Sequence, residues 1–171
     1  MEEKLSTIET RLTTKVGEIK KDVESLEIEK RRSNIVIHGL KEGDDDLVKV
    51  KEILSQGLKM DSERHVSEIY RIGQRKDDKI RPVRVTLKSF EGKMEIIKRA
   101  KTLKDSNDFK RVYISPDLTR LQQLQDKELR DMLKSYRQQN SEDRIIIKGG
   151  KIIKKEESGQ KSTLFEFPKE M

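Results

Sequence analysis

The first 33 residues carry a regular apolar repeat, and this repeat constrains the fold more than any other feature of the chain. Its members follow one another at spacings of 3, 4, 4, 3, 4 and 3 residues, and they are Leu5, Ile8, Leu12, Val16, Ile19, Val23 and Leu26. Such spacing is typical of a coiled-coil seam, with one four-residue stutter between Leu12 and Val16. Because a stripe this narrow does not stabilise a lone helix, the repeat predicts self-association through residues 1–33.

Two alternatives stay open for this helix. It can pack along its own chain instead of a second copy, and its mixture of Val, Ile and Leu does not decide between a dimer and a trimer. The outer faces are rich in Lys and Glu, and the eight basic and eight acidic residues of the segment cancel in charge. Nothing in this segment therefore attracts a polyanion by net charge.

Composition excludes several classes of protein. Of the 171 residues, 42% are charged, 32% are apolar and none is Cys, which rules out disulfides, cysteine-ligated zinc modules and thiol catalysis. No apolar run reaches the roughly 18 residues of a membrane span, and the N-terminal residues lack a signal-peptide core. We therefore expect a soluble intracellular protein with no membrane partner.

Residues 34–118 alternate between the strand and helix periodicities. Strands are expected at residues 34–40, 66–72, 81–90 and 112–114, and helices over residues 47–58 and 94–104. The resulting order is β-α-β-β-α-β, in which both helices cover one face of the sheet and leave the other open. Ser115 and Pro116 then predict the cap and first turn of a further helix.

Residues 119–171 predict a smaller C-terminal domain made of a helix and a β-hairpin. The helix has an apolar stripe that consists of Leu121, Leu124, Leu129, Met132, Leu133 and Tyr136. Residues 144–155 predict the hairpin, with Gly149 and Gly150 as a two-residue turn. The tail is polar up to Leu164, Phe165 and Phe167, which we expect to dock back. The chain as a whole is thus expected to be α+β.

Positive charge is concentrated in residues 71–104, which hold 12 basic and 4 acidic residues in a chain of net charge +7. This excess favours nucleic acid as the partner, although a solvated basic surface is the plain alternative. Val83, Val85 and Leu87 should face the helices, which places Arg84 and Lys88 on the open sheet face. The central-strand positions that often carry base-stacking aromatics are Val36 and Arg84, so phosphate attraction should carry the affinity.

Five short motifs follow the apolar repeat along the chain, namely RRSNIVIHGL (31–40), YRIG (70–73), RPVRVTL (81–87), IKRA (97–100) and ISPDLT (114–119). In this order they closely resemble the first open reading frame protein of LINE-1-type retrotransposons. The similarity covers nearly the whole chain. It implies a homotrimeric coiled coil over residues 1–33, an atypical RNA-recognition-motif (RRM) domain over residues 34–118 and a C-terminal domain over residues 119–171.

The resemblance also implies a function and a set of contacts. Members of the family bind the RNA of their own element and act as nucleic acid chaperones. By matching motif positions, the implied RNA contacts are Arg31, Arg32, Arg71, Arg81, Arg84, Lys98 or Arg99, and Lys101, with Arg144 at a basic position that opens the last strand pair. The charge pattern and predicted strands add Arg75, Lys88, Lys104 and Tyr113 as candidates.

No arrangement of residues predicts catalysis or a cofactor. His38 and His65 lack a carboxylate or histidine at metal-ligand spacing, so both are interpreted as structural or surface residues. Asp44, Asp45 and Asp46 fit the N-terminus of a helix better than a cation site. We therefore predict a protein that is not an enzyme and has no metal, no cofactor and no small-molecule substrate.

The leading prediction is a homotrimeric protein that binds single-stranded RNA and DNA in a cleft between the two small domains. It would form ribonucleoprotein particles in the cytoplasm, with the nucleus as a second location. The alternative is a coiled-coil structural or interaction protein whose RRM-like sheet binds another protein. A nuclease or a polymerase accessory enzyme is a third hypothesis, which no constellation of residues supports.

Overall fold

The computed structural model of the chain describes residues 2–76, 79–140, 143–156 and 158–167. The chain divides into two compact units, Met1–Asp117 and Leu118–Met171. Each unit has its own antiparallel sheet and its own apolar core, and the long N-terminal helix belongs to the first. The predicted α+β class is therefore confirmed.

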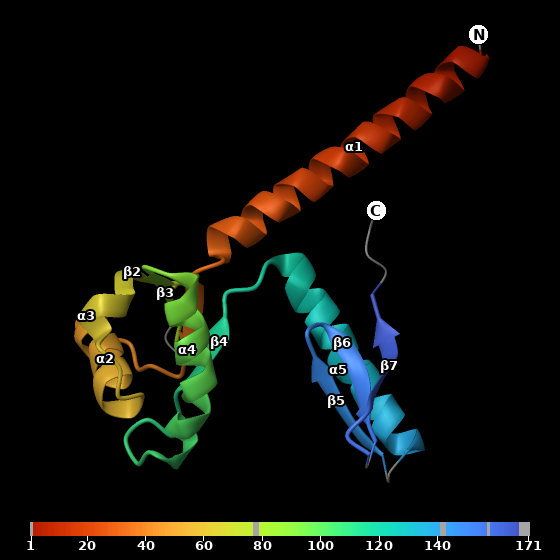
Figure 1. Ribbon diagram of the computed structural model, residues 1–171. Helices are drawn as coiled ribbons and strands as arrows, with labels where there is room; N and C mark the ends of the chain where they lie inside the picture. The colour runs from red at the N-terminus through yellow and green to blue at the C-terminus, as the bar shows by residue number, and fades with distance from the viewer. Residues whose placement is uncertain (1, 77–78, 141–142, 157, 168–171) are drawn as a thin grey trace. The chain divides into compact units, whose positions relative to one another are not determined.

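Helix α1 (Glu2–Arg31) is a single uninterrupted helix (Figure 1). At about 1.5 Å per residue it is roughly 45 Å long. All seven residues of the apolar repeat are exposed on it, from 47% at Val16 to 71% at Leu26. The structure therefore does not show the alternative, in which this helix packs its apolar stripe against its own chain.

The first unit holds a four-stranded antiparallel sheet with the strand order β2-β3-β1-β4. Its strands are β1 (Asn34–His38), β2 (Val66–Arg71), β3 (Val83–Leu87) and β4 (Tyr113–Pro116). Its helical elements are α2 (Asp46–Glu52), the π-helical turn η1 (Ile53–Gly57), α3 (Ser62–His65), α4 (Phe90–Ala100) and the 3-10 helix η2 (Lys101–Asp105). The sequence order agrees with the expected alternation, with the short α3 as an addition.

The core of this unit lies on one face of the sheet, where α2, η1, α4 and η2 cover it. Its fully buried sheet members are Ile35, Ile37, Val83 and Val85, which cross-strand pairing places side by side. Ile96 of α4 and Leu103 of η2 complete the core from the helical layer. The expectation that alternate residues of β3 point at the helices is confirmed by the burial of Val83, Val85 and Leu87.

A glycine is required where β1 ends. Gly39 has a φ of +81°, and a Cβ atom there would lie 2.1 Å from the carbonyl oxygen of Arg111. Only a residue without a side chain allows the chain to turn this close to the segment before β4.

The prediction for Ser115 and Pro116 is wrong. Both belong to β4, where Ser115 pairs with Val36 and Pro116 with Ile35. Pro is tolerated here because β4 is an edge strand. The next helix, α5 (Arg120–Gln139), instead begins with a capping box formed by Thr119 and Gln122.

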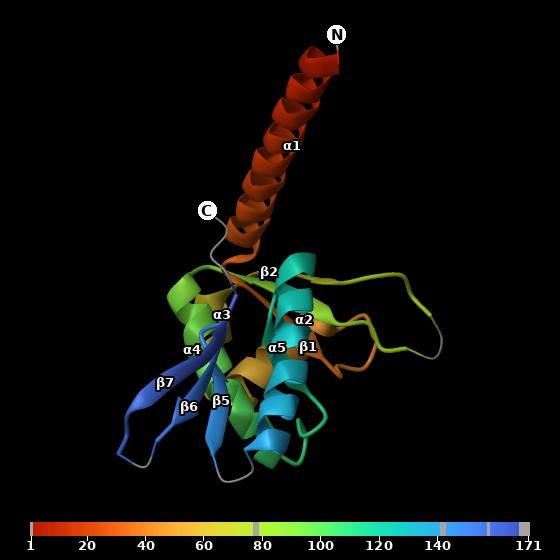
Figure 2. The same cartoon turned by 90° about the vertical axis from the view of Figure 1, so that its right-hand side faces the viewer.

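The connection between β2 and β3 projects from the sheet as an extended arm, described over residues 72–76 and 79–82 (Figure 2). Lys76 and Lys79 form an isolated antiparallel bridge within it. The predicted strand over residues 81–90 is shorter at both ends, because Arg81 and Pro82 belong to the arm and Ser89 and Phe90 cap and begin α4.

The end of α1 is joined to α4. Lys93 is buried, and its Nζ donates a hydrogen bond to the carbonyl oxygen of Arg32 at 2.7 Å, next to the last turn of α1. Burial lowers the pKa of Lys93. The guanidinium of Arg32 lies over the ring of Phe90, 5.0 Å from its centroid. These contacts of Lys93 and Phe90 connect the end of the N-terminal helix to α4 of the sheet domain.

The second unit packs α5 against a three-stranded sheet of order β5-β6-β7. Its strands are β5 (Arg144–Lys148), β6 (Lys151–Lys155) and β7 (Lys161–Glu166). The β5–β6 turn is the predicted one, with φ values of +59° at Gly149 and +72° at Gly150. The predicted hairpin therefore gains a third strand from the tail, and Leu164, Phe165 and Phe167 pack on the core.

Candidate nucleic-acid interface

The face of the first sheet opposite the helices is the platform on which the sequence places Arg84. Cross-strand pairing aligns four residues on it in one row, namely Tyr70, Arg84, Val36 and Ser115. A second row brings His38 of β1 beside Tyr113 of β4. We call these six residues the open face, because the core of this unit uses the alternate residues of the same strands.

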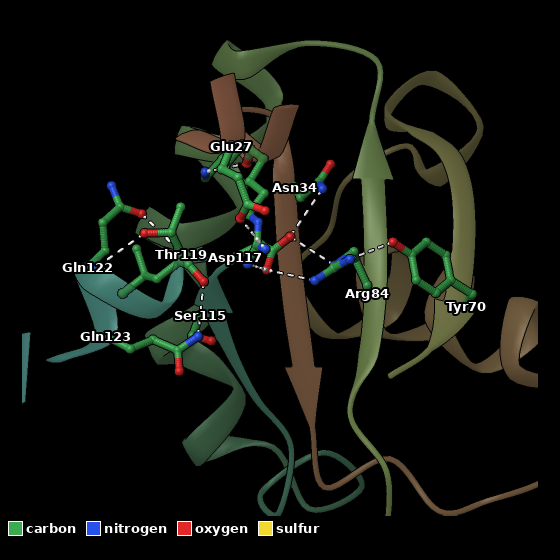
Figure 3. A network of polar contacts seen from close by, with 12 residues as sticks. Glu27, Asn34, Tyr70, Arg84, Ser115, Asp117, Thr119, Gln122 and Gln123 are labelled. Atoms are coloured by element: carbon green, nitrogen blue, oxygen red, sulfur yellow. Dashed lines mark hydrogen bonds and ion pairs between the residues drawn. The ribbon is translucent and has the colours of Figure 1, made fainter. Parts of the chain in front are cut away.

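Arg84 lies on this face as predicted, but its guanidinium is already engaged within the chain. Figure 3 shows it between the hydroxyl of Tyr70 and the carboxylate of Asp117. Nη1 donates a hydrogen bond to the Tyr70 oxygen at 2.6 Å, and Nη2 donates one to Asp117 Oδ1 at 3.2 Å. Nε lies 2.8 Å from Asp117 Oδ2 in an ion pair without hydrogen-bond geometry. The expectation of an exposed, unpaired Arg84 is therefore wrong.

Asp117 is the centre of this arrangement, and its side chain is only 4% exposed. Besides Arg84, it accepts a hydrogen bond from Asn34 Nδ2 at 3.2 Å and lies 3.8 Å from Nη1 of Arg31. Burial by itself would lower the pKa of Arg84, but the hydrogen bond to Tyr70 and the charge of Asp117 raise it overall. A buried carboxylate with two arginines and an amide is a satisfied structural centre.

Tyr113 provides the most accessible ring of the open face, with 60% of its surface exposed. It stacks on the imidazole of His38, with ring centroids 4.3 Å apart and planes 2° from parallel. His38 Nε2 lies 3.1 Å from Ser115 Oγ, and burial lowers the pKa of His38, which favours the neutral ring at pH 7. One face of the tyrosine ring is therefore covered by the stacked imidazole, and the rest of the ring stays accessible to a ligand.

Tyr70, on the edge strand β2, is 44% exposed and lies beside the guanidinium of Arg84, 5.4 Å from the ring centroid. The open face thus has aromatic rings on its two outer strands, while its central positions are Val36 and Arg84 as predicted. The strand pattern leaves both Tyr70 and Tyr113 undecided between filling the core and offering a ring to a base. The exposure of Tyr70 shows that it is a surface ring.

Arg71 and Arg81 are also engaged within the chain. Arg71 pairs across the sheet with Val83, so its side chain lies on the helix-covered face, and it is only 7% exposed. It binds the carboxylate of Asp46 and donates to the carbonyl oxygens of Leu40 and Arg81 at 2.8 and 2.6 Å. The prediction that Arg71 lines one surface with Arg84 is wrong, because the alternation of side chains along the strands places them on opposite faces.

Arg81 forms an ion pair with Glu42, with 2.9 Å between Nη2 and Oε2. The hydrogen bond from the Arg81 side chain is the main reason why the pKa of Glu42 falls to about 2. Together the Arg71–Asp46 and Arg81–Glu42 pairs hold the loop after β1 against the base of the β2–β3 arm. These two arginines are primarily supports of that loop.

The cations predicted on the second helix lie on α4 and η2, in the layer that covers the other side of the sheet. Lys98, Lys101 and Lys104 are exposed or partly exposed there, and Arg99 pairs with Glu95 at 2.6 Å. Since α4 packs on the inward residues of β3, these cations do not share a surface with Tyr70 and Tyr113. They form a separate basic ridge, and the predicted single cluster is wrong in this respect.

The remaining candidates are scattered. Lys88 is exposed beyond the end of β3 and donates a hydrogen bond to the carbonyl oxygen of Glu63, whereas Arg75 is exposed on the arm. Arg31 contacts Glu27 at 2.6 Å in addition to Asp117, and Arg32 is exposed at the end of α1. Arg144 is exposed at the start of β5 in the second unit, so the cleft expected between the domains stays a prediction.

Sequence reasoning missed His38 as a part of the open face, and Asp117 and Asn34 as residues that contact it or each other beside Arg84. The available signal was the strand alternation itself, because Asn34 and His38 are two residues from Val36 on the same strand. No local signal reveals Asp117, since the residues that it contacts lie 33 and 83 positions away in the chain.

Other kinds of site are not found in the part of the chain that the structure describes. No group of three or more His, Asp or Glu side chains is placed there to hold a metal ion. None of the helices in the described ranges is both long enough and apolar enough to cross a lipid bilayer. No protein-family model matches the sequence, and no curated protein matches it either.

Proposed function

We propose that this chain is a homo-oligomeric protein that binds single-stranded RNA and DNA. The observation that carries the proposal is the open face of the first sheet, on which Tyr70 and Tyr113 expose their rings on either side of Arg84. A sheet face that carries exposed rings is suited to unstacked bases, and the +7 charge of the chain attracts the phosphates.

The fold supports a more specific assignment. The strand order β2-β3-β1-β4, with the helices on one face, supports an RRM-like domain, and the exposed repeat of α1 supports a coiled coil. With the motif resemblance, we assign the chain to the first open reading frame proteins of LINE-1-type retrotransposons. It would form a homotrimer that packages the element RNA in cytoplasmic ribonucleoprotein particles and also enters the nucleus.

Both aromatic rings and cations would contribute to binding, the rings through the bases and the cations through the phosphates. Stacking of a base on the exposed ring of Tyr113 contributes about 1–3 kcal/mol to the binding free energy. Exposed cations such as Lys88 and Arg75 attract phosphates without fixing the bases. Arg84, held by Asp117, sets the position of Tyr70 through its hydroxyl. Weak contacts of this kind let strands exchange, which is the physical basis of nucleic acid chaperone activity, and they require no catalytic group.

Substitution of Tyr113 tests the proposal. Tyr113→Leu should weaken binding of a fluorescent single-stranded 30-mer at least fivefold in an anisotropy titration at moderate salt, because a stacking partner of about 1–3 kcal/mol is removed. Tyr113→Phe is the matched control, since it keeps the ring that stacks on His38 and should bind like the native chain. Equal affinity of the Leu variant and the native chain would contradict the stacking role.

A second candidate function is favoured by one observation. Three of the arginines that the resemblance implies as RNA contacts, Arg71, Arg81 and Arg84, are neutralised by Asp46, Glu42 and Asp117. A sheet with less available charge can instead bind another protein, with the coiled coil as a scaffold. The absorbance ratio at 260 and 280 nm after purification at low salt discriminates the two: co-purified nucleic acid favours the first, and a protein spectrum with no retardation of a 30-mer favours the second.

A further inference from the structure

A surface pocket of about 410 Å³ lies beyond the end of β1 in the first unit, and we call it the loop pocket. Three stretches of chain line it: residues 39–41 after β1, Lys49 and Glu52 of α2, and residues 107–112 before β4. Its volume falls within the range of about 300–1,000 Å³ that is usual for ligand pockets. None of the six residues of the open face lines it, so it is a separate feature of the surface.

The walls of the loop pocket are held by the fold itself. On one side Gly39 turns the chain with a φ of +81°, in close approach to the backbone of Arg111. On the other side the amide of Val112 donates a hydrogen bond to the carbonyl oxygen of Phe109 at 2.8 Å, which closes a turn before β4. The ring of Phe109 also lies next to Gly57. Because both walls are fixed in advance, a ligand would need little ordering of this chain in order to bind.

The inner part of the loop pocket is apolar. Leu40 and Val112 are only 7% and 9% exposed and belong to the core of the unit, and Phe109 is partly buried against the same core. An apolar side chain that enters the pocket would therefore extend this core and leave water. Such a buried apolar anchor is the usual centre of a protein interaction site.

The rim of the loop pocket carries cations that the fold does not neutralise. Lys41, Lys110 and Arg111 are exposed, and no ion pair in the described part of the chain involves them. The fourth cation of the lining, Lys49, is already paired with Asp45 at 2.6 Å. The three available cations attract carboxylates to the edge of an apolar site.

Two exposed carboxylates, Glu52 and Asp108, also line the loop pocket, and they decide between two classes of ligand. The phosphates of a nucleic acid strand are all negative, so both carboxylates would repel them. A peptide instead has backbone N–H groups that donate to carboxylates, while its own acidic side chains pair with the cations. The mixture of charges therefore favours a peptide over a polyanion.

We propose that the loop pocket binds a short acidic peptide segment of a partner protein. An apolar side chain of the segment lies against the three core residues, and the carboxylates beside it pair with the exposed cations of the rim. The anchor supplies most of the affinity, and the flanking charges fix the position of the segment. This site goes beyond the function proposed above and does not depend on it.

The test uses the full chain and a labelled peptide in which one leucine and one phenylalanine are flanked on both sides by glutamates. Lys110→Glu with Lys41→Glu should weaken its binding at least tenfold by anisotropy, because two attractive charges become repulsive. Both side chains are exposed, so the variant should fold like the native chain in circular dichroism. The matched control, Lys127→Glu with Lys148→Glu, makes the same change of net charge at exposed residues of the second unit and should change the affinity less than threefold.

Two altered peptides separate direct contact from an indirect effect. A peptide that keeps the leucine and phenylalanine but has lysines in place of the glutamates should bind the charge-reversed variant at least threefold more tightly than it binds the native chain. A peptide that keeps the glutamates but has serines in place of the leucine and phenylalanine should bind the native chain at least tenfold more weakly, because the anchor is lost.

Several results would overturn the proposal. Equal binding of the acidic peptide to the native chain and the charge-reversed variant would do so, as would equal binding of the serine peptide, which would show attraction of charge without use of the pocket. A native chain that binds none of the peptides would also overturn it. In that case, weaker binding of a single-stranded 30-mer by the variant would identify the occupant as nucleic acid, and a lower oligomer mass in light scattering would identify it as a second copy of the chain.

Discussion

At the scale of single residues, the main finding is that three arginines act as internal supports. Arg71, Arg81 and Arg84 find their carboxylates 25, 39 and 33 positions away along the chain. A buried or half-buried guanidinium needs such a partner, because an uncompensated charge away from water is strongly unfavourable. Their planar, multiply donating geometry also explains why Arg and not Lys occupies these positions.

Substitution of Arg71, the most buried of these three arginines, should reduce the stability of the fold. Arg71→Ala should lower the free energy of unfolding by about 3–5 kcal/mol, because it leaves Asp46 and the carbonyl oxygens of Leu40 and Lys41 without their donor. Urea denaturation followed by circular dichroism measures this change. Arg75→Ala, on the exposed arm, should stay within about 0.5 kcal/mol of the native chain. Equal effects of the two substitutions would contradict the role given to Arg71.

The pair of Arg81 and Glu42 predicts a pH dependence. The hydrogen bond from the Arg81 side chain lowers the pKa of Glu42 from 4.5 to about 2. Because the folded state holds the ionised form, the pair contributes stability above pH 4.5, and this contribution is lost as the pH falls from 4.5 towards 2. Thermal midpoints of the native chain and Glu42→Gln should therefore differ most above the ordinary pKa of Glu42 and converge as the pH approaches its lowered value. A difference that persists undiminished in acid would contradict this assignment.

At the scale of secondary-structure elements, periodicity predicted whether a segment is a helix or a strand far better than it predicted where the segment begins and ends. The period-2 pattern of β3 and the apolar repeat of α1 are regular, and both elements formed, although β3 is shorter than expected. Pro116 was misplaced because a proline serves equally well in the first turn of a helix and in an edge strand, and only the sheet order decides which. The strand β7 was missed because its polar residues alternate with apolar ones only over a short stretch, next to a bulge.

The same scale explains how α1 is fixed. The last carbonyl groups of any helix have no backbone partner within it, and Lys93 of α4 reaches a carbonyl just beyond the last turn of α1. A cation at a helix C-terminus also interacts favourably with the helix dipole. An assembly through α1 would therefore carry the sheet domains on a defined and not a freely hinged connection.

At the scale of the whole molecule, the proposed assembly would set the affinity for nucleic acid. A site made of one or two stacked bases and a few phosphates binds weakly, whereas linked copies raise the effective concentration and can strengthen binding by about 10²–10⁴-fold. The exposed repeat on α1 is the surface through which copies would meet. The open face of each copy would then offer the strand a further point of contact.

A seam substitution tests this relation. Ile19→Asp places a carboxylate in the repeat and should convert the oligomer to a monomer in light scattering, with about a hundredfold weaker binding of a 30-mer. Thr14→Asp, which adds the same group to the face of α1 opposite the repeat, should keep both the oligomer and the affinity. The mass of the native oligomer also decides between the trimer and the dimer. A native chain that is already monomeric would overturn the assembly.

The sequence by itself determined the α+β class, the apolar stripe of α1 and the inward side of β3, because these follow from the spacing of apolar residues along one element. It also placed Val36 and Arg84 on the central strands of the open face, where they pair. Only the tertiary structure decided which cations stay available, since Asp117, Glu42 and Asp46 reach their arginines through the fold and not through the local chain. Net charge is a property of composition, but whether a charged side chain is available to a ligand depends on which residues the fold places beside it.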